Sequence, residues 1–489
     1  MIDRRAAIVG LAAGLTLPAS LSAQGRDLGE ILDAAVADPR AGLAALDRLA
    51  APSTLAGRLD RDAARAGLAA DVALQLFWGP ARAGRPLFRV TPRAGAWRSP
   101  ARDAEAIDRD TAALAHDVAA GILLPHSAIA ELIPALDAAA ATASRDVASA
   151  LGRQRALLVA RPAPAPGLVH LRNGPALYAA LLRRTSGSAA PAAARRRLVR
   201  ERDALLARAD RLFRRVGLAT GTVGDRYSAL FRDPRWLYSD DDNGRSRAID
   251  EMNAMTAHAA SHVAATVEDV PGFCLDARVR ALSAVELAKN VAGYREVPAP
   301  GRAGAYVVDL KDIRRRPRWT LPSVVAHELL PGHMIQLGIE GITPPHPLRL
   351  DYAAAFVEGW GIHAETLAGE AGAFADPHVE LGHIHWLLFR VARALADLAI
   401  HLDGWSLART RAALVEWQGE PAYFAPFDVE LSRIAIEPTA RVAEALAWFA
   451  IRDAVAGLDP AARRGRHAAL LAGGRKRNDA IAALPKETA

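Results

Sequence analysis

The sequence predicts a mainly α-helical protein with one small antiparallel β-sheet. Ala, Leu and Arg are abundant among the 489 residues, whereas aromatic residues make up only 6%. This composition favours helices over sheet. Apolar residues recur at three- and four-residue steps through much of residues 27–215, as amphipathic helices require. Between residues 272 and 313 the pattern changes to short β-branched and aromatic runs between Pro and Gly turns, which indicates strands.

The N-terminus has the pattern of an export signal. An arginine pair precedes a mostly apolar run over residues 6–17, and small residues follow it. This order of charged, apolar and small-residue segments predicts cleavage near Ser22 or Ala23, after passage through the general secretory or the twin-arginine route. We therefore expect residues 1–23 to be removed and the mature protein to be exported to the periplasm.

The mature chain reads as two regions that we expect to form one continuous globular unit. We expect residues 24–270 to form a helical scaffold that also supplies a wall of the substrate pocket. Residues 271–489 contain the candidate metal-site motifs. The net charge of +7 falls to +6 once the signal is removed, because the signal holds two arginines and one aspartate. Basic residues are scattered along Ala-rich helices, which indicates solvated faces rather than nucleic-acid binding. The mature region has no long uncharged apolar run, so we expect no membrane span.

Two short segments of the second region have the composition of a metal site. In the first, His327 and His333 bracket Glu328 and Pro331, and Glu358 follows 25 residues after His333. Two neutral imidazoles and one carboxylate form a ligand set for zinc that leaves a fourth position open for water. Glu328 would then be the base that takes a proton from that water.

The six-residue spacing of the two histidines conflicts with a straight helix. Residues six apart lie about 240° round a regular helix, so His327 and His333 would point in different directions. Pro331 cannot donate to the carbonyl of His327 and clashes with it, which forces the helix to open. Gly332 permits backbone angles that other residues resist. We therefore expect a local bulge that swings His333 back toward His327.

A second helix is expected from about residue 350 to residue 368. On it Glu358 and Glu365 are seven residues apart and share a face. Glu358 is the better third ligand, because Gly359 beside it leaves room for a close helix approach, and Glu365 could orient a ligand from behind. The alternative is that the two glutamates form a buried salt-bridge layer.

The motif H-E-x-x-P-G-H followed by E-G-W-x-x-x-x-E resembles the bacterial domain of unknown function 885 family, whose members look like zinc metallopeptidases. The similarity is strongest over about residues 294–405. The second motif is also similar to the N-E-G-F-A-x-Y-x-E segment of gluzincin aminopeptidases, in which the first glutamate binds zinc. The resemblance implies a multi-helix zinc-metallopeptidase-like fold, with His327, His333 and Glu358 as ligands and Glu328 as general base.

Near the C-terminus the sequence departs from the family pattern. Relatives tend to have an Arg-Tyr pair where this chain has Arg433 and Ile434. If that tyrosine stabilises an oxyanion in relatives, the role passes here to His401 or Tyr423. His401 could equally be a satisfied core histidine. Arg433 could bind a substrate carboxylate, with Tyr423 as a second contact, or pair structurally with neighbouring glutamates.

Together these features predict an exported hydrolase that uses one Zn²⁺ ion and cleaves short peptides or related amides. One alternative is a metal-dependent hydrolase or lyase acting on a non-peptide substrate. Another is a non-catalytic metal- or peptide-binding protein, although zinc binding alone would not need a base at Glu328. We expect no nucleic-acid partner, and the sequence gives no signal for an oligomeric state.

Overall fold

The computed structural model describes residues 23–78, 87–161, 163–187, 190–289, 291–420 and 426–484. Helices make up 70% of the structure and strands 4%, which confirms the mainly α prediction. Within the described residues, no helix is long and apolar enough to cross a membrane. Residues 1–22 of the predicted export signal and Tyr423 lie outside the described residues.

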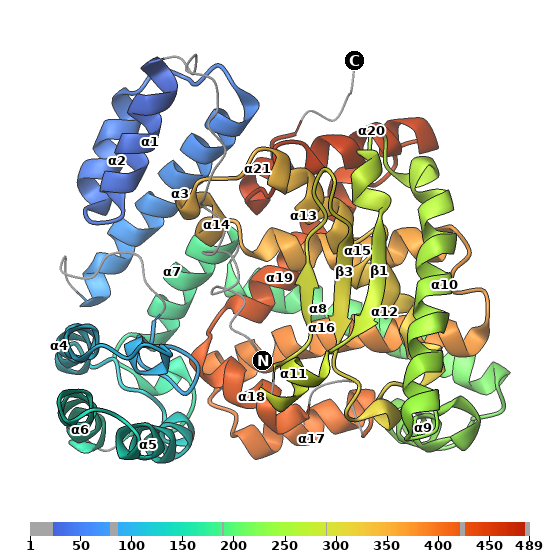
Figure 1. Ribbon diagram of the computed structural model, residues 1–489, viewed down its shortest axis with the longest axis horizontal. Helices are drawn as coiled ribbons and strands as arrows, with labels where there is room; N and C mark the ends of the chain where they lie inside the picture. Colours follow the sequence, from blue (N-terminus) through green and yellow to red (C-terminus); the bar gives the residue numbers. More distant parts are fainter. Residues whose placement is uncertain are drawn as a thin grey trace.

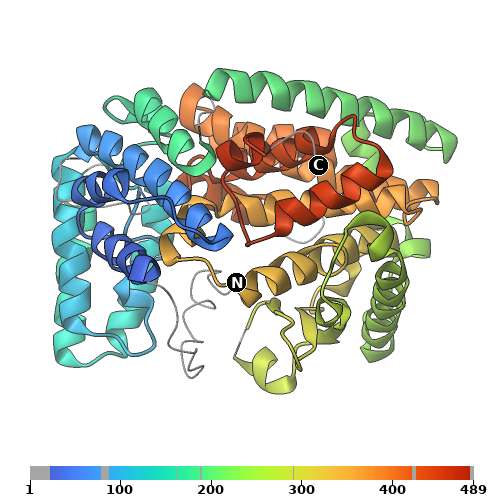
Figure 2. The same ribbon diagram turned by 90° about the horizontal axis from the view of Figure 1, so that it is seen from above.

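The N-terminal half consists of helices. Figure 1 shows α1 to α3 above α4 to α6 on one side of the molecule. Figure 2 shows the long green helix α8 along an outer face of the molecule. α3 packs against α7, and α8 packs along the central helix α16. The bounds are α1 (Ala23–Ala35), α2 (Pro39–Arg48), α3 (Leu55–Trp78), α4 (Ala104–Ala119), α5 (His126–Ala141), α6 (Arg145–Val159), α7 (Gly174–Ser186), α8 (Pro191–Arg215) and α9 (Val223–Arg232).

A three-stranded sheet follows the long helix α10 (Asp242–Thr266), in the order β1-β3-β2. The strands are β1 (Ala277–Ala281), β2 (Tyr294–Glu296) and β3 (Gly304–Val308), and α11 (Ala284–Ala288) lies between β1 and β2. β2 pairs antiparallel with β3, but β1 pairs parallel with β3. The prediction of an antiparallel sheet is therefore wrong for one of the two pairs. The physical reason is that the chain leaves β1 through α11 and β2, and so re-enters at β3 in the direction of β1.

The next helices hold the candidate site: α12 (Leu321–Glu328), α13 (His333–Ile342), α14 (Pro347–Tyr352), α15 (Ala355–Glu370) and α16 (Pro377–Asp403). Asp376 caps the start of α16 by accepting two main-chain N–H groups, and Gly404, at φ 66°, ends the helix. Every residue of α16 from 381 to 401 is buried. In Figure 2, α16 lies between α8 on one side and the sheet on the other.

The C-terminal helices close the core around α16: α17 (Leu407–Gln418), α18 (Phe427–Ile436), α19 (Ala440–Val455), α20 (Pro460–Leu471) and α21 (Asn478–Ala482). α19 packs tightly against α15, where a Cβ on Gly359 would lie 2.7 Å from the Cβ of Ala447. This is the close helix approach expected at Gly359. The largest hydrophobic core extends from Leu74 to Phe449, so side chains from both sides of residue 270 share it.

Candidate metal centre

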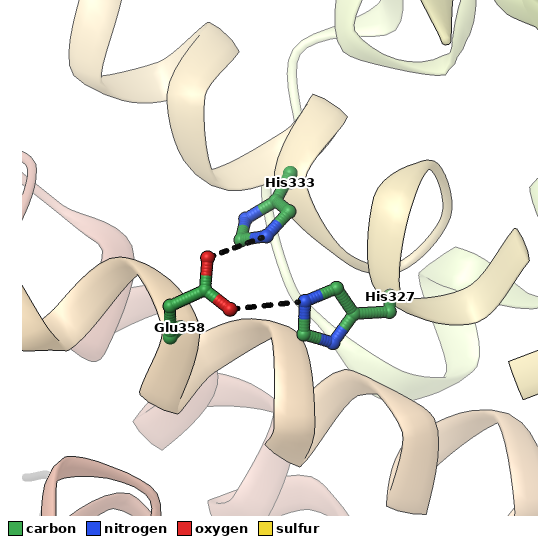
Figure 3. Close-up of side chains that lie close together, drawn as sticks. All are labelled: His327, His333 and Glu358. Carbon is green, nitrogen blue, oxygen red and sulfur yellow. Dashed lines mark ion pairs between the residues drawn. The ribbon is translucent and has the colours of Figure 1, made fainter. Parts of the chain in front are cut away.

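Three buried side chains from three helices converge on one point (Figure 3). His327 lies in the last turn of α12, His333 begins α13, and Glu358 lies in the first turn of α15. The Nε2 atom of His327 is 3.6 Å from one carboxylate oxygen of Glu358, and the Nε2 atom of His333 is 4.0 Å from the other. All three ligand atoms lie within 4.8 Å of one another.

The spacing of these atoms fits a metal ion. Two ligands of a tetrahedral zinc ion, each about 2.1 Å from it, lie about 3.4 Å apart. The separations of 3.6 and 4.0 Å, and the 4.8 Å within which all three ligand atoms lie, exceed that value by amounts that side-chain rotations can close. The buried group of His327, His333 and Glu358 could therefore hold a metal ion.

The chain brings the two histidines together by breaking the helix completely. α12 ends at Glu328 and α13 begins at His333, with four non-helical residues and a cis Leu330–Pro331 peptide between them. We expected a bulge within one helix, and the structure corrects this to two separate helices. The predicted outcome holds, because the ring centroids of His327 and His333 are 4.7 Å apart.

The turn between these helices leaves no space for a side chain at Gly332. A Cβ atom there would lie 2.0 Å from the carbonyl oxygen of His327 and 2.4 Å from that of Ala326. The indole of Trp360 on α15 donates to the carbonyl of Pro331 at 3.1 Å. The turn is therefore packed against α12 and tied to the helix that carries Glu358.

Glu365 fixes the orientation of His327. The Nδ1 atom of His327 lies 2.9 Å from a carboxylate oxygen of Glu365. The proton of the imidazole belongs on Nδ1 in this contact, so the lone pair of Nε2 points toward Glu358. A Cβ on Gly361 would lie 2.6 Å from Cε1 of this ring and within 2.9 Å of both its nitrogens, so the ring needs the space that this glycine leaves. Glu365 thus occupies the supporting position that the sequence predicted.

The charges around His327 also affect its proton. Burial and the nearby Arg390 disfavour the charged imidazole, but Glu358 and Glu365 together outweigh them and raise its pKa above the ordinary value. Glu365 itself is fully buried, which by itself raises the pKa of a carboxyl. Its contacts with His327 and His383 reverse that effect, so the pKa of Glu365 is lowered. A metal ion would have to compete with a proton for Nε2 of His327.

Glu328 lies on the more exposed side of this centre. Its carboxylate accepts a short hydrogen bond from Nε of Arg295 on the edge strand β2. The side chains of Glu328 and Arg295 are 17% and 15% exposed, whereas that of His327 is 4% exposed. The contact between Arg295 and Glu328 confirms that the sheet lies next to the helix of the first motif. In the sheet, Arg295 stands opposite Tyr306 of β3.

Sequence reasoning missed Arg390, which reaches the centre from α16. Its Nη2 atom is 3.3 Å from Nε2 of His327, and Nη1 is 3.5 Å from Glu358. The residue is 7% exposed, and its guanidinium lies 5.1 Å from the ring centroid of Trp386. A signal existed, because an arginine within a continuous apolar helix must find a charged partner.

His401 occupies a structural position. Its Nε2 donates to the carbonyl of Ile434 at 2.8 Å, and its Nδ1 accepts from the main-chain N–H of Leu168 at 3.3 Å. Burial lowers the pKa of His401 to about 4. It lies eleven residues beyond Arg390 on α16, about 16 Å along the helix axis. The predicted catalytic role does not fit this position, and the alternative of a satisfied core histidine does.

Arg433 also favours the structural alternative. Its guanidinium lies 3.7 Å from Glu430 and 3.8 Å from Glu437. Glu430 is in turn paired with the buried Arg393 and Arg441. Arg433 is therefore part of an ion-pair network between α16, α18 and α19.

Comparisons with known proteins agree with the fold. Two solved structures each match over 94% of this chain. One is described as a "putative lipoprotein" from Colwellia psychrerythraea, with TM-score 0.70, 17% identity and 89% of its chain covered. The other is described as a "putative lipoprotein of unknown function" from Shewanella oneidensis, with TM-score 0.64, 15% identity and 92% covered. No curated protein matches the sequence.

The family assignment rests on a longer match. The model of the family described as "Bacterial protein of unknown function (DUF885)" matches residues 35–474. This range includes all three side chains of the metal centre, as well as Glu328 and Arg390. The chain therefore belongs to the DUF885 family of bacterial proteins.

Proposed function

We propose that this chain is an exported zinc-dependent hydrolase that cleaves short peptides or related amides. The observation that carries the proposal is the buried group of His327, His333 and Glu358, oriented by Glu365, with Glu328 directly after the first ligand. Two imidazoles and one carboxylate are the ligand set of catalytic rather than structural zinc, because they leave one position open.

His327, His333 and Glu358 would hold the ion, which when bound supplies a Lewis acid for a carbonyl group and lowers the pKa of water. Glu328 is the base in this proposal. Its carboxylate accepts a proton from the attacking water and passes it to the leaving nitrogen. Arg295 pairs with the ionised form of Glu328, which is the form that a base needs.

Export is part of the proposal. It is supported by the charged, apolar and small-residue segments within residues 1–23. The two similar structures are each described as a "putative lipoprotein", which supports a location outside the cytoplasm. A non-catalytic metal-binding protein fits less well, because it would gain nothing from an ionised carboxylate at Glu328.

Metal analysis and peptide hydrolysis test the proposal together. We expect the purified wild-type chain to contain about one zinc ion, and His333→Ala to lose it because one of three protein ligands is gone. Glu328→Gln should keep its zinc and lose turnover by about 10²-fold or more. A peptide library with free and blocked termini supplies the substrates. Unchanged zinc in His333→Ala, or full activity in Glu328→Gln, would contradict the proposal.

A further inference from the structure

The guanidinium of Arg390 is held at the metal centre by its surroundings. Both terminal nitrogens face the ligand side chains, with Nη2 3.3 Å from His327 and Nη1 3.5 Å from Glu358. The rings of Trp386 and Phe389 lie 5.1 and 5.7 Å from it. With only 7% of the residue exposed, Arg390 cannot exchange these contacts for bulk water without moving α16 or its own side chain.

Metal binding would take away one of the acceptors of Arg390. When His327 is neutral and its proton is on Nδ1, facing Glu365, the single lone pair of Nε2 can accept from Nη2 of Arg390. An ion bound at Nε2 uses that lone pair. The N–H group of Arg390 then needs another acceptor, since leaving a buried charged donor unpaired is costly.

The charge of the loaded site indicates what that acceptor would be. A divalent ion and Arg390 together carry three positive charges, which exceed the two negative charges of Glu358 and of Glu365 behind His327. The neighbouring carboxylate of Glu328 is already paired with Arg295. Buried positive charge of this kind is stabilised by an anionic partner, and a guanidinium binds anionic oxygens through paired N–H groups.

We propose that Arg390 is an oxyanion-binding residue of the metal-loaded site. Its guanidinium donates to an anionic oxygen of a ligand that lies beside the ion, such as a carboxylate or a phosphate group. This inference rests on the proposed function in requiring a bound metal ion. If the protein is a hydrolase, Arg390 would contact an anionic oxygen of the substrate. That oxygen belongs either to a carboxylate next to the scissile bond or to the reacting carbonyl, on which negative charge develops.

Inorganic phosphate is the probe for a first test that does not depend on turnover. Zinc-loaded wild-type chain should bind phosphate in a calorimetric titration, and Arg390→Gln should bind it at least tenfold more weakly. The same substitution should tighten zinc binding in competition with a chromogenic chelator, because it removes a positive charge from beside the ion. Arg390→Lys keeps the positive charge but not the paired N–H donors. Its phosphate affinity should lie between those of the wild type and Arg390→Gln.

Arg393→Gln is the matched control. Arg393 lies one turn further along α16, is 6% exposed, and pairs with Glu430 and Glu444 instead of the metal ligands. Its replacement should leave phosphate and zinc affinities at wild-type values. Equal phosphate affinity in wild type and Arg390→Gln, or an equal loss in Arg393→Gln, would overturn the inference while the zinc site stands. A wild-type chain that takes up no zinc would instead overturn the proposed function.

Kinetics with peptides that have free or amidated C-termini distinguish the two sources of the anionic oxygen, a substrate carboxylate and the reacting carbonyl. If Arg390 binds a substrate carboxylate, Arg390→Gln should raise KM for free peptides and leave amidated ones unchanged. If it binds the oxygen of the reacting carbonyl, kcat should fall equally for both. Unchanged kinetics for both kinds of peptide would again overturn the assignment of Arg390.

Discussion

Glu365 decides which nitrogen of His327 faces Glu358, because its carboxylate accepts a hydrogen bond from the Nδ1–H group at 2.9 Å. We expect Glu365→Gln to weaken zinc binding by about 10- to 100-fold, since the amide can present an N–H group to Nδ1 and no longer fixes the tautomer. Competition with a chelator of known affinity measures this directly.

Glu370→Gln is the control for that measurement. Glu370 lies on the same helix α15, but its side chain is 47% exposed and pairs with Arg463. Its substitution should leave zinc affinity unchanged. If Glu365→Gln bound zinc as tightly as Glu370→Gln, the carboxylate of Glu365 would have no part in orienting the ligand.

The side chains of the metal centre divide into two kinds with respect to prediction. His327, His333 and Glu358 could be predicted because two imidazoles and a carboxylate are the ligand chemistry of zinc, and Glu365 because it shares a helix face with Glu358. Arg295 and Arg390 could not. They lie 33 and 63 residues from their partners in the centre, and only the packing of β2 and α16 brings them there.

Among the secondary-structure elements, the junction between α12 and α13 determines whether the two histidines meet. Gly332→Ala would place a Cβ atom 2.0 Å from the carbonyl oxygen of His327, so the backbone there must shift. We expect loss of bound zinc and a destabilisation of about 1–3 kcal/mol, the usual cost of forcing extra atoms into a packed site. Zinc content and denaturant unfolding are the two measurements.

The control lies on α13 itself. A Cβ added to Gly341 meets nothing within 4 Å. Gly341→Ala should therefore keep the zinc and raise stability by about 0.5–1 kcal/mol, because alanine loses less entropy in a helix than glycine. Zinc retention by Gly332→Ala would show that the junction tolerates a side chain and that the histidine spacing does not depend on it.

The ends of the helices and strands in this region could be predicted better than the way in which the strands pair. The helix break was foreseeable because Pro331 lacks an N–H group and clashes with the preceding turn. The parallel pairing of β1 and β3 was not, because side-chain alternation identifies a strand but does not say in which direction its neighbour runs. The direction depends on the path of the chain between residues 281 and 304.

Over the whole molecule, burial of neutral histidines makes stability depend on pH. Burial lowers the pKa of His385, His401 and His467 to about 4 each, against about 6.5 in an unfolded chain. Between these values the unfolded chain binds more protons than the folded one. Stability contributed by these groups is therefore complete above about pH 6.5 and is lost as the pH falls toward 4.

His401→Asn tests this coupling. Asn keeps a donor for Ile434 and an acceptor for Leu168 but does not titrate. We expect the free energy of unfolding of the variant to depend less on pH between 4 and 6.5, by up to about 1.4 kcal/mol per pH unit, with zinc content unchanged. His126→Asn, at an exposed position, should keep the wild-type pH profile. A variant with the wild-type slope would show that His401 titrates normally in the folded protein.

The contact between Gly359 and Ala447 has a consequence for recognising this centre in other sequences. α19 carries none of the three side chains that could hold a metal ion, yet its backbone packs closely against α15, the helix that carries Glu358. A homologous sequence with intact histidines and glutamate but bulky residues at these two helix positions could not seat its carboxylate at the same depth. The pattern that we expect to identify this candidate site is therefore discontinuous, and it includes small residues almost ninety positions apart as well as the two histidines and the glutamate.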